Sequence, residues 1–391
     1  MRSRWTILAV LFVARAAMAF QFQSVGAIAP LISDRVGASL ADIGILIGLY
    51  LAPGVALALP GATIGQRYGD KATVLAGLLM MLSGELVMMA STSWSLQVGG
   101  RLVAGTGGVL LNVLMTKMVA DWFAGREIAT AMAIYINSWP AGIAIALMLL
   151  PAIGTTYGMT GVGIAVLVMI VAGFVLIAFV YRAPEGSPTR GIERRGISAG
   201  ITFALITAGL IWCLYNVAFA MVFSFGPSML VERGWSSSAA GSAISVVLWL
   251  AALSVPLGGL LADRSKRGGA VLTAGCAGFA VLVLLLSRSG SVLPLAIAMG
   301  IVCGLPAGAI MSLPARVLDQ GTRSVGMGVF YTIYYVGMLA APAIGGKLAV
   351  WAGTATAALN FGAAALLICP LLLWSFHRIS RLQKPMVAPS R

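Results

Sequence analysis

Gly259-Leu260-Leu261-Ala262-Asp263-Arg264-Ser265-Lys266-Arg267 is a short charged stretch that separates two long apolar runs, residues 236–262 and 269–287. A run of about 20 apolar residues is long enough to cross a bilayer as a helix. A charged break of this length between two such runs is typical of a loop at the membrane surface. The stretch therefore indicates two consecutive membrane helices, and the rest of the chain repeats this alternation.

The composition extends this interpretation to the whole chain of 391 residues. Hydrophobic residues make up 60% of the sequence, charged residues make up 9%, and the mean hydropathy is +1.00. Soluble domains carry about 25% charged residues, so a water-soluble globule is excluded. We predict an all-α polytopic membrane protein with twelve spans, at 5–31, 40–63, 72–91, 95–120, 127–150, 158–181, 199–226, 236–262, 269–287, 292–316, 322–346 and 353–376.

Lysine and arginine are unevenly distributed between the two sides of these spans. Short loops rich in these residues stay in the cytoplasm. One side carries basic clusters within 2–4, 67–71, 117–126, 182–195, 264–267, 316–323 and 378–391. The other side has only Arg35, Arg233, Arg288 and Lys347. We therefore predict a multi-pass protein with both termini in the cytoplasm, and we expect it in a bacterial inner membrane.

The two halves of the chain match each other at an offset of about 197 residues. Equivalent positions hold Pro30 and Pro227, Ser39 and Ser236, Gly44 and Gly241, Gly61 and Gly258, Arg67 and Arg264, and Arg126 and Arg323. Transporters use internal repeats of this kind to build two pseudo-symmetric bundles. We predict a six-helix bundle at 1–181, a cytoplasmic basic linker at 182–198, a second six-helix bundle at 199–376 and a cytoplasmic tail at 377–391.

The charged stretch 259–267 resembles the G-x-x-x-D-R-x-G-R-[RK] signature of the major facilitator superfamily. Residues 101–108 are similar to the superfamily's fourth-helix motif, and residues 337–346 are similar to its G-x-x-x-G-P-x-x-G-G motif, here in the eleventh span. The equivalent loop of the first half departs from the signature, because Gln66 replaces the acid and Asp70 replaces a basic residue. The resemblance implies a secondary transporter in which the charge contacts of this loop are altered.

Within the superfamily, the chain is most similar to the cyanate-permease-like group. The similarity rests on Arg15 in the first span followed by Ser24-Val25-Gly26 and Pro30, and on the stretch Asp121-Trp122-Phe123-Ala124-Gly125-Arg126-Glu127. In that group the arginine usually lies nearer the Ser-Val-Gly triplet, so the resemblance implies no particular substrate.

Several other functions lack support in the sequence. There is no Walker sequence and no zinc-binding spacing, and the sole histidine, His377, lies in the predicted tail, so we expect no enzyme, cofactor or metal site. The cysteines lie in apolar runs without a C-x-x-C spacing and are interpreted as small core residues: Cys213, Cys276, Cys303 and Cys369. The basic residues are clustered between spans, which favours membrane orientation over nucleic-acid binding. The expected partners are a small molecule, a co-transported or exchanged ion and lipid, around a monomer.

Arg15 is expected about ten residues into the first span, roughly 15 Å deep, since a helix rises 1.5 Å per residue. A guanidinium at that depth costs at least ~2.5 kcal/mol unless it finds a partner or water. Two interpretations are open: the arginine is tied to backbone carbonyls of a neighbouring helix, or it binds an anion in a water-filled central cavity. We favour the anion site, with Phe22 on the same helical face.

Further candidates for the cavity lining are aromatic and amide residues at helical spacing. In the superfamily that the sequence resembles, the first, fourth, seventh and tenth helices line the path, with the second, fifth, eighth and eleventh beside them. Aromatic residues at this spacing are also typical of plain helix packing, so both interpretations stay open. The candidates are Trp212, Tyr215, Asn216, Phe219 and Tyr331, followed by Asn112, Asn137, Trp249 and Tyr335.

Glu85 is the only acid predicted inside a span, and Arg101 lies at a similar depth in the next span. Antiparallel neighbouring helices bring these charges to one level, where pairing neutralises two costly buried ions. We predict a buried, structural ion pair. The alternative is a proton-linked switch, in which Glu85 is protonated and releases Arg101.

The repeated loop positions predict a gate on the cytoplasmic side. Asp263 is expected to bridge helix ends or basic groups when the cavity faces outward, and to lose that contact when the cavity opens inward. The other gating candidates are Arg264, Arg67, Arg126 and Arg323.

Two functions remain open on these observations. The first is secondary active transport of a small organic or inorganic anion by alternating access around a site at the membrane midplane. The second is efflux of neutral amphipathic compounds, in which Arg15 is structural. An ion or substrate gradient drives either process.

Overall fold

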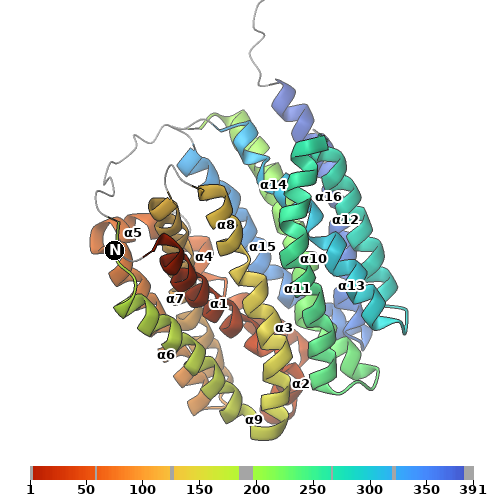
Figure 1. Cartoon of the computed structure of the whole chain (residues 1–391). Coiled ribbons are helices and arrows are strands. Elements are labelled where there is room, and N and C mark those ends of the chain that lie inside the picture. The colour runs from red at the N-terminus through yellow and green to blue at the C-terminus, as the bar shows by residue number, and fades with distance from the viewer. Residues whose placement is uncertain are drawn as a thin grey trace, which may run out of the picture.

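The computed structural model describes residues 3–57, 60–123, 127–184, 197–265, 267–318 and 323–382. These residues form helices joined by short turns, with no β-strand in the described ranges. The helices form two groups that lie side by side, one from each half of the sequence (Figure 1). The predicted all-α membrane fold is confirmed.

Prolines divide the first two predicted spans into shorter helices. The first span bends before Pro30, and the second is divided near Pro53 and Pro60, because proline has no N–H to continue a helix. The first half contains α1 (Arg4–Ala27), α2 (Ala29–Val36), α3 (Leu40–Leu49), α4 (Pro53–Leu57), α5 (Gly61–Tyr68), α6 (Asp70–Ala90), α7 (Trp94–Phe123), α8 (Ile128–Ile136) and α9 (Ser138–Phe179).

The number of spans depends on α9. The described residues contain eleven candidate spans, and the longest is Ile134–Phe179. This segment reverses at Gly158, whose φ of 66° lies in the left-handed region that glycine adopts without strain. Figure 1 shows its two arms running in opposite directions. Counting both arms gives the twelve predicted spans.

Two helices of the second half are longer than predicted. α10 continues past 226 and through Pro227, and α16 continues past 376, so His377 lies in a helix rather than in a tail. The second half contains α10 (Ala199–Glu232), α11 (Ser237–Ser265), α12 (Gly268–Leu286), α13 (Val292–Cys303), α14 (Leu305–Met311), the 3-10 helix η1 (Pro314–Arg316), α15 (Arg323–Ala352) and α16 (Thr356–Leu382).

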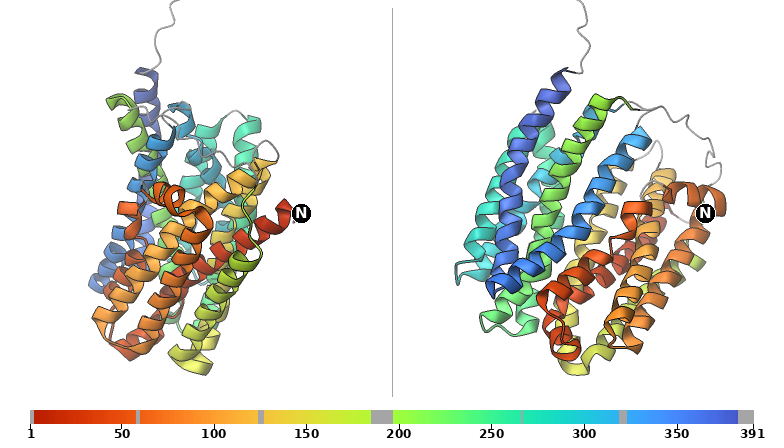
Figure 2. Two further views of the ribbon diagram at one scale, coloured as in Figure 1. Left: turned by 90° about the vertical axis from the view of Figure 1, so that its left-hand side faces the viewer. Right: turned by 180° about the vertical axis from the view of Figure 1, so that it is seen from behind.

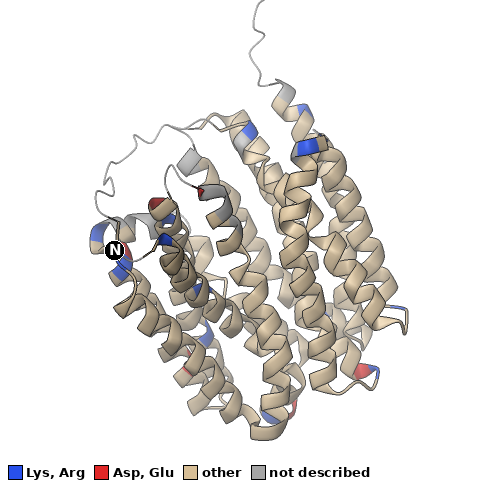
Figure 3. Cartoon of the chain, in the orientation of Figure 1, with Lys and Arg blue, Asp and Glu red and all other residues tan. Residues whose placement is uncertain are grey.

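The two ends of the molecule are distinguished by the positions of the termini, the residues that flank the linker and the reversal at Gly158. The residues that flank the linker lie at the same end as the described termini, and we call this the linker end (Figures 1 and 2). The opposite end, which contains the reversal at Gly158, is called the far end. Charged residues lie mainly toward the two ends, and most of the ribbon between them consists of other residues (Figure 3). The predicted linker 182–198 lies mostly outside the described residues.

The two halves make close backbone contact toward the far end. A Cβ atom added at Gly44 of α3 would lie 2.1 Å from the Pro342 carbonyl oxygen of α15, and one at Gly48 would lie 2.2 Å from the Leu339 carbonyl oxygen. At the equivalent position of the repeat, a Cβ added at Gly241 of α11 would lie 2.2 Å from a carbonyl oxygen of α9. Only glycine permits so close an approach of two helices. The pairs α3–α15 and α9–α11 therefore hold the far ends together.

Candidate functional site

Arg15 of α1 lies beside the break between α8 and α9 and is half-buried. Its Nε atom donates a hydrogen bond to Asn112 Oδ1 of α7 at 2.9 Å. Its Nη1 atom donates to the carbonyl oxygens of Tyr135 and Ile136, each at 3.1 Å, and to Ser138 Oγ at 3.3 Å. The guanidinium is therefore held by protein oxygens on two neighbouring segments.

Pro140 explains why a carbonyl is available at this break. The missing N–H of Pro140 leaves the Ile136 carbonyl without its partner four residues along the helix. Arg15 supplies the replacement donor, and its guanidinium carbon also lies 4.8 Å from the ring centre of Tyr135 and 5.9 Å from that of Trp139. Arg15 thus makes the backbone contacts that the structural interpretation expected. Pro140 was the signal in the sequence that pointed to them.

Arg15 also has features that the anion interpretation requires. Within the described residues it forms no ion pair, and its Nη2 atom makes no hydrogen bond to them. Its partner Asn112 donates from Nδ2 to the Tyr335 hydroxyl of α15 at 3.4 Å. The rings of Tyr334 and Tyr335 lie 5.2 Å apart, and Tyr331 follows at 6.5 Å from Tyr334. Side chains from both halves therefore meet around Arg15.

An aromatic column on α10 continues from this group. Trp212 stacks on Tyr215 at 5.6 Å and on Phe330 at 6.4 Å, and its buried indole N–H has no hydrogen-bond partner among the described residues. Phe219 follows Tyr215 at 6.5 Å. Phe22 is fully buried and packs on Trp139, Tyr50 and Phe223, which places it in the contact between the halves.

Three predicted lining residues use their polar atoms elsewhere. The Tyr215 hydroxyl donates to the Cys303 carbonyl inside the second half at 2.8 Å, and the Asn216 amide donates to the carbonyl of Trp212 on its own helix at 2.8 Å. The Asn137 amide donates across the interface to the Ala252 carbonyl at 2.9 Å. In this conformation backbone carbonyls accept from all three polar groups, and the role of these residues as substrate contacts stays a prediction.

Trp249 is separate from this group. Its side chain is exposed on α11, together with Leu253 and Leu257. In the described part of the chain it makes no ring contact or hydrogen bond with the Arg15 group. Its spacing along the helix could not show which face of α11 points toward the other half.

Glu85 and Arg101 lie in one buried group, as predicted, but they are not in direct contact. Both side chains are buried, but they form no ion pair within the described residues, and Gln21 of α1 links them. The Gln21 amide donates to Glu85 Oε2 at 3.0 Å, whereas its backbone carbonyl accepts from Arg101 Nη1 at 2.9 Å. Arg101 also donates to the carbonyls of Leu46, at 2.9 Å, and Phe22. Arg101 therefore donates to backbone carbonyls, and Glu85 accepts from the Gln21 amide, where the sequence predicted that the two would contact each other.

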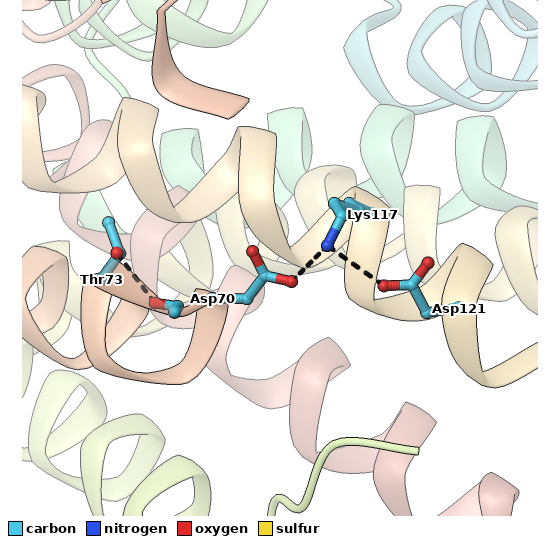
Figure 4. Close-up of polar contacts among 5 residues, drawn as sticks. Asp70, Thr73, Lys117 and Asp121 are labelled. Atoms are coloured by element: carbon cyan, nitrogen blue, oxygen red, sulfur yellow. Dashed lines mark hydrogen bonds and ion pairs between the residues drawn. The ribbon is translucent and has the colours of Figure 1, made fainter. Parts of the chain in front are cut away.

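A second charged cluster lies near the linker end of the first half (Figure 4). Lys117 of α7 pairs with Asp70 at the start of α6 at 2.5 Å and with Asp121 at 3.3 Å. Asp70 is one of the two residues that depart from the superfamily signature in this loop. Its carboxylate is therefore engaged within its own half, which gives the altered loop charge a structural role.

The gating candidates are described only in part. Arg67 is exposed, with its guanidinium carbon 5.5 Å from the ring centre of Tyr68, and Arg264 is exposed at the end of α11. Asp263 and Arg323 belong to α11 and α15, but their side chains lie outside the described residues. Arg126 also lies outside them. The gate therefore stays a prediction.

The buried charges are confined to one half of the molecule. Among the described residues, Glu85 and Arg101 are the charged side chains that are buried, and both belong to the first half. The second half has instead the aromatic column and four buried free cysteines, Cys213, Cys276, Cys303 and Cys369. The two halves thus share helix geometry but differ in the chemistry of their interiors.

Comparisons with known proteins agree with this architecture. The profile of the Major Facilitator Superfamily matches residues 11–241 and 201–387. The inner membrane transport protein YajR of Escherichia coli (strain K12) is 23% identical over 329 residues, covering 81% of this chain and 70% of that protein. The hexuronate transporter of Bacillus subtilis (strain 168) is 23% identical over 257 residues, covering 60% of this chain and 58% of that protein. The choline/ethanolamine transporter FLVCR2 of Homo sapiens is 24% identical over 155 residues, covering 39% of this chain and 30% of that protein.

These matches identify a family but no substrate. The chain spans 58% of the hexuronate transporter and 30% of FLVCR2, and none of the three relatives is a cyanate permease, so the narrower resemblance is not supported. The profile match extends over most of the chain and agrees with the twelve spans and the repeat. Members of this family are transporters and not enzymes. The chain therefore belongs to the major facilitator superfamily of membrane transporters.

Proposed function

We propose that this protein is a secondary active transporter of a small organic or inorganic anion, with Arg15 as the charge partner of the substrate. The observation that carries the proposal is the unbalanced charge of Arg15. It is a half-buried guanidinium in the first span, and no carboxylate pairs with it in the described residues. An anion supplies the missing charge at a depth where an idle cation is costly.

The geometry around Arg15 suits a carboxylate or a similar planar anion. Nε and Nη1 are occupied by protein oxygens, so the edge of the guanidinium that carries Nη2 is left for a ligand. A charge-assisted hydrogen bond from Nη2 fixes the anion, and the Tyr335 hydroxyl beside Asn112 offers a second donor. The tyrosines of α15 then enclose the rest of the molecule.

The names of the relatives bear on the substrate in different ways. One relative is named as a transporter of hexuronates, which carry a carboxylate, and this agrees with an anion. FLVCR2 is named for choline and ethanolamine, which are cations, but it matches only 39% of this chain. The guanidinium of Arg15 would repel a cation, and no acid pairs with the Arg15 group in the described ranges to offset that repulsion.

A second function is favoured by the hydrogen bonds of Arg15. Four protein oxygens accept from its Nε and Nη1 atoms, which satisfies much of the guanidinium without a ligand. An efflux carrier for neutral amphipathic compounds needs no more than this structural role, because aromatic rings supply its binding surface. The two functions differ in whether binding depends on the charge of Arg15.

Transport follows from alternating access around this site. The pairs α3–α15 and α9–α11 close the far end, which the distribution of basic residues assigns to the outside of the cell. The linker end then faces the cytoplasm of a bacterial cell, and Asp263 with its basic neighbours forms the gate there. A monomer suffices, because both halves of the site come from one chain.

The test compares a charged ligand with a neutral one of the same shape. Thermal stability of the purified protein is measured with glucuronate, with glucose and with a panel of small carboxylates, because a ligand that binds the native state raises apparent stability. Arg15→Ala is expected to abolish the shift caused by the best carboxylate, and Arg15→Lys to retain a weak shift. Arg233→Ala is the matched control, because Arg233 also donates to backbone carbonyls but lies at the far end.

Each outcome separates the two functions. Loss of the carboxylate shift in Arg15→Ala, with the shift kept in Arg233→Ala, supports the anion site. Equal shifts in wild type and in a correctly folded Arg15→Ala would reject it. In that case, retained efflux of neutral amphipathic compounds by Arg15→Ala would establish the second function.

A further inference from the structure

Equivalent pairs of an acid and an arginine lie at the far end of the two halves. Asp34-Arg35 lies at the end of α2, and Glu232-Arg233 lies at the end of α10. Each pair is followed by a glycine in the left-handed region, Gly37 with a φ of 68° and Gly234 with a φ of 88°. The repeat therefore places the same two charges at the same point of each bundle, and their contacts can be compared.

In the second half, this pair joins three helices. The Glu232 carboxylate accepts from the Thr354 hydroxyl at 2.7 Å and from the Ala355 backbone N–H at 2.8 Å, at the start of α16. Arg233 donates to the Leu286 carbonyl at the end of α12 at 3.0 Å. Backbone groups at helix ends lack a helical partner, and a carboxylate suits the start of a helix as an arginine suits its end. The pair therefore ties α10 to both α12 and α16.

In the first half, the equivalent pair makes no such contacts. Gln97 of α7 donates to the carbonyls of Met88 and Ser91 at the end of α6, at 2.8 Å and 2.5 Å. Gln97 thus has the role at α6 that the arginine of the second half has at α12. The side chains of Asp34 and Arg35 form no hydrogen bond or ion pair with the described residues. The tie of the second half is therefore missing in the first.

A pocket of about 110 Å³ lies where this tie is missing. The exposed residues of its lining are Arg35, Thr92 and Thr160. A Cβ atom added at Gly158 would lie 3.3 Å from Arg35 Nη2, so the guanidinium lies at the start of the second arm of α9, which is the equivalent of α16. All the lining residues belong to the first half, so the pocket is separate from the interface around Arg15.

The charges of the pocket favour an anion at its mouth. Glu85 is the other charged residue of the lining, and it is buried in one group with Arg101, which balances its charge. Arg35 has no counter-charge in the described lining, since Asp34 is exposed outside it. An anion supplies the missing charge at the mouth, whereas Arg35 would repel a cation there.

The second half indicates which kind of anion fits this place. There the carboxylate of Glu232 occupies the start of the equivalent helix. In the first half, the guanidinium of Arg35 and the hydroxyls of Thr92 and Thr160 offer donors to a carboxylate at the same point. The wall of the pocket also contains three methionines, whose flexible side chains can pack on a short apolar chain: Met88, Met89 and Met159.

We propose that this pocket is a second anion site, in which Arg35 and the start of the second arm of α9 bind the carboxylate of a small organic acid from the far side of the membrane. The bound acid has the place that Glu232 has in the second half, and it ties α2 to α9. This goes beyond the proposed substrate site, because the pocket is formed by one half alone and its occupancy does not depend on Arg15.

The test measures occupancy of the pocket by the labelling rate of a cysteine at its mouth. Thr92→Cys places a thiol at this exposed position, while the four native cysteines are buried. Butanoate is expected to slow the labelling by about tenfold, because a ligand enclosed by the pocket blocks access to its mouth. Butanamide, which has the same shape without the charge, and chloride at equal ionic strength are expected to leave the rate unchanged. Ser291→Cys, in the equivalent exposed turn of the second half, is the control position.

Further variants, each combined with Thr92→Cys, identify the groups that bind the carboxylate. Arg35→Gln is expected to abolish the protection by butanoate. Arg288→Gln is the matched control, because Arg288 is another exposed arginine of the far end that lies outside the pocket. Thr160→Glu supplies a carboxylate from the chain itself at the start of the second arm of α9, as Glu232 does at α16. It is expected to exclude butanoate and to raise the apparent melting temperature.

The outcomes separate this site from the proposed substrate site. Protection in Arg15→Ala as strong as in wild type supports the pocket, even if the Arg15 proposal fails its own test. Protection that is lost in Arg15→Ala, or that persists in Arg35→Gln, would overturn the pocket site, as would equal protection by butanamide. Protection that persists in Thr160→Glu would overturn the placement of the carboxylate at the start of the arm.

Discussion

At the scale of single residues, polar side chains recur at carbonyls that prolines have freed. A proline leaves the carbonyl four residues earlier without its helical N–H, and in a membrane that carbonyl needs another donor. Three such carbonyls have a donor from another segment: Ile136 before Pro140 takes Arg15, Phe223 before Pro227 takes Gln23, and Ala252 before Pro256 takes Asn137. The last two join the two halves. Proline thus creates the acceptors that hold this membrane protein together.

Arg101 is the residue whose loss we expect to cost most stability. Its guanidinium is fully buried and donates to three carbonyls of α1 and α3, so Arg101→Leu removes these hydrogen bonds and the buried positive charge nearest to Glu85. We predict a loss of about 3–5 kcal/mol in the free energy of unfolding, measured by denaturant titration in micelles. Arg233→Leu removes an arginine from carbonyls at the surface and should cost much less. The double variant Glu85→Leu, Arg101→Leu should recover only part of the loss, since the three hydrogen bonds from Arg101 are not restored. Equal losses for Arg101→Leu and Arg233→Leu would contradict this view.

The charged residues inside the spans could be predicted from the sequence, but their hydrogen-bond partners could not. Arg15, Glu85 and Arg101 are visible because charge is rare in apolar runs. Their partners are an amide and backbone carbonyls, which every helix contains and no pattern marks. The spacing of Tyr215 on α10 likewise shows that it repeats with its neighbours, but not that its hydroxyl faces the Cys303 carbonyl. Contacts of this kind depend on the rotation of each helix about its axis.

At the scale of helices, glycine determines how closely the halves approach. The repeat predicted that Gly44 and Gly241 are equivalent, and each packs against a carbonyl of the other half. The bounds of the helices were predicted less well. The predicted span ended before Pro227, but a membrane helix continues through a proline when another segment supplies a hydrogen-bond donor. Helix number and order follow from the sequence, whereas breaks and extensions depend on packing.

Gly44→Ala is expected to push the far end open. The added methyl group would lie 2.1 Å from the Pro342 carbonyl oxygen, so α3 and α15 must separate. Overpacking of this kind costs about 1–3 kcal/mol in the closed state, which shifts the population toward the open one. The measurement is the labelling rate of Ala343→Cys at one pH, which should rise. Gly99→Ala is the control, because nothing lies within 4 Å of its added Cβ. An unchanged rate in Gly44→Ala would show that the glycine contact does not hold the gate.

At the scale of the whole molecule, orientation follows from the charges of the loops. The basic clusters predict that the linker end lies in the cytoplasm, and both described termini lie at that end. A green fluorescent protein fused after Leu382 should therefore fluoresce, and alkaline phosphatase fused at Gly290, in the exposed turn after α12, should be active outside. Exchanging the two fusions supplies the control. Active phosphatase at Leu382 would reverse the assignment of inside and outside.

The confinement of buried charge to the first half bears on how such a molecule arose. A repeat of this length indicates duplication of a gene that encoded one bundle, and the ancestral product would have paired two identical copies. In the present chain Glu85 and Arg101 have no buried charged counterpart among the described residues of the second half, and Trp212 stands where the repeat would place a second Arg15. The copies have specialised. Two first halves would bring two copies of Arg15 to the contact between the halves, and two second halves would bring none, so we expect that neither bundle can replace the other.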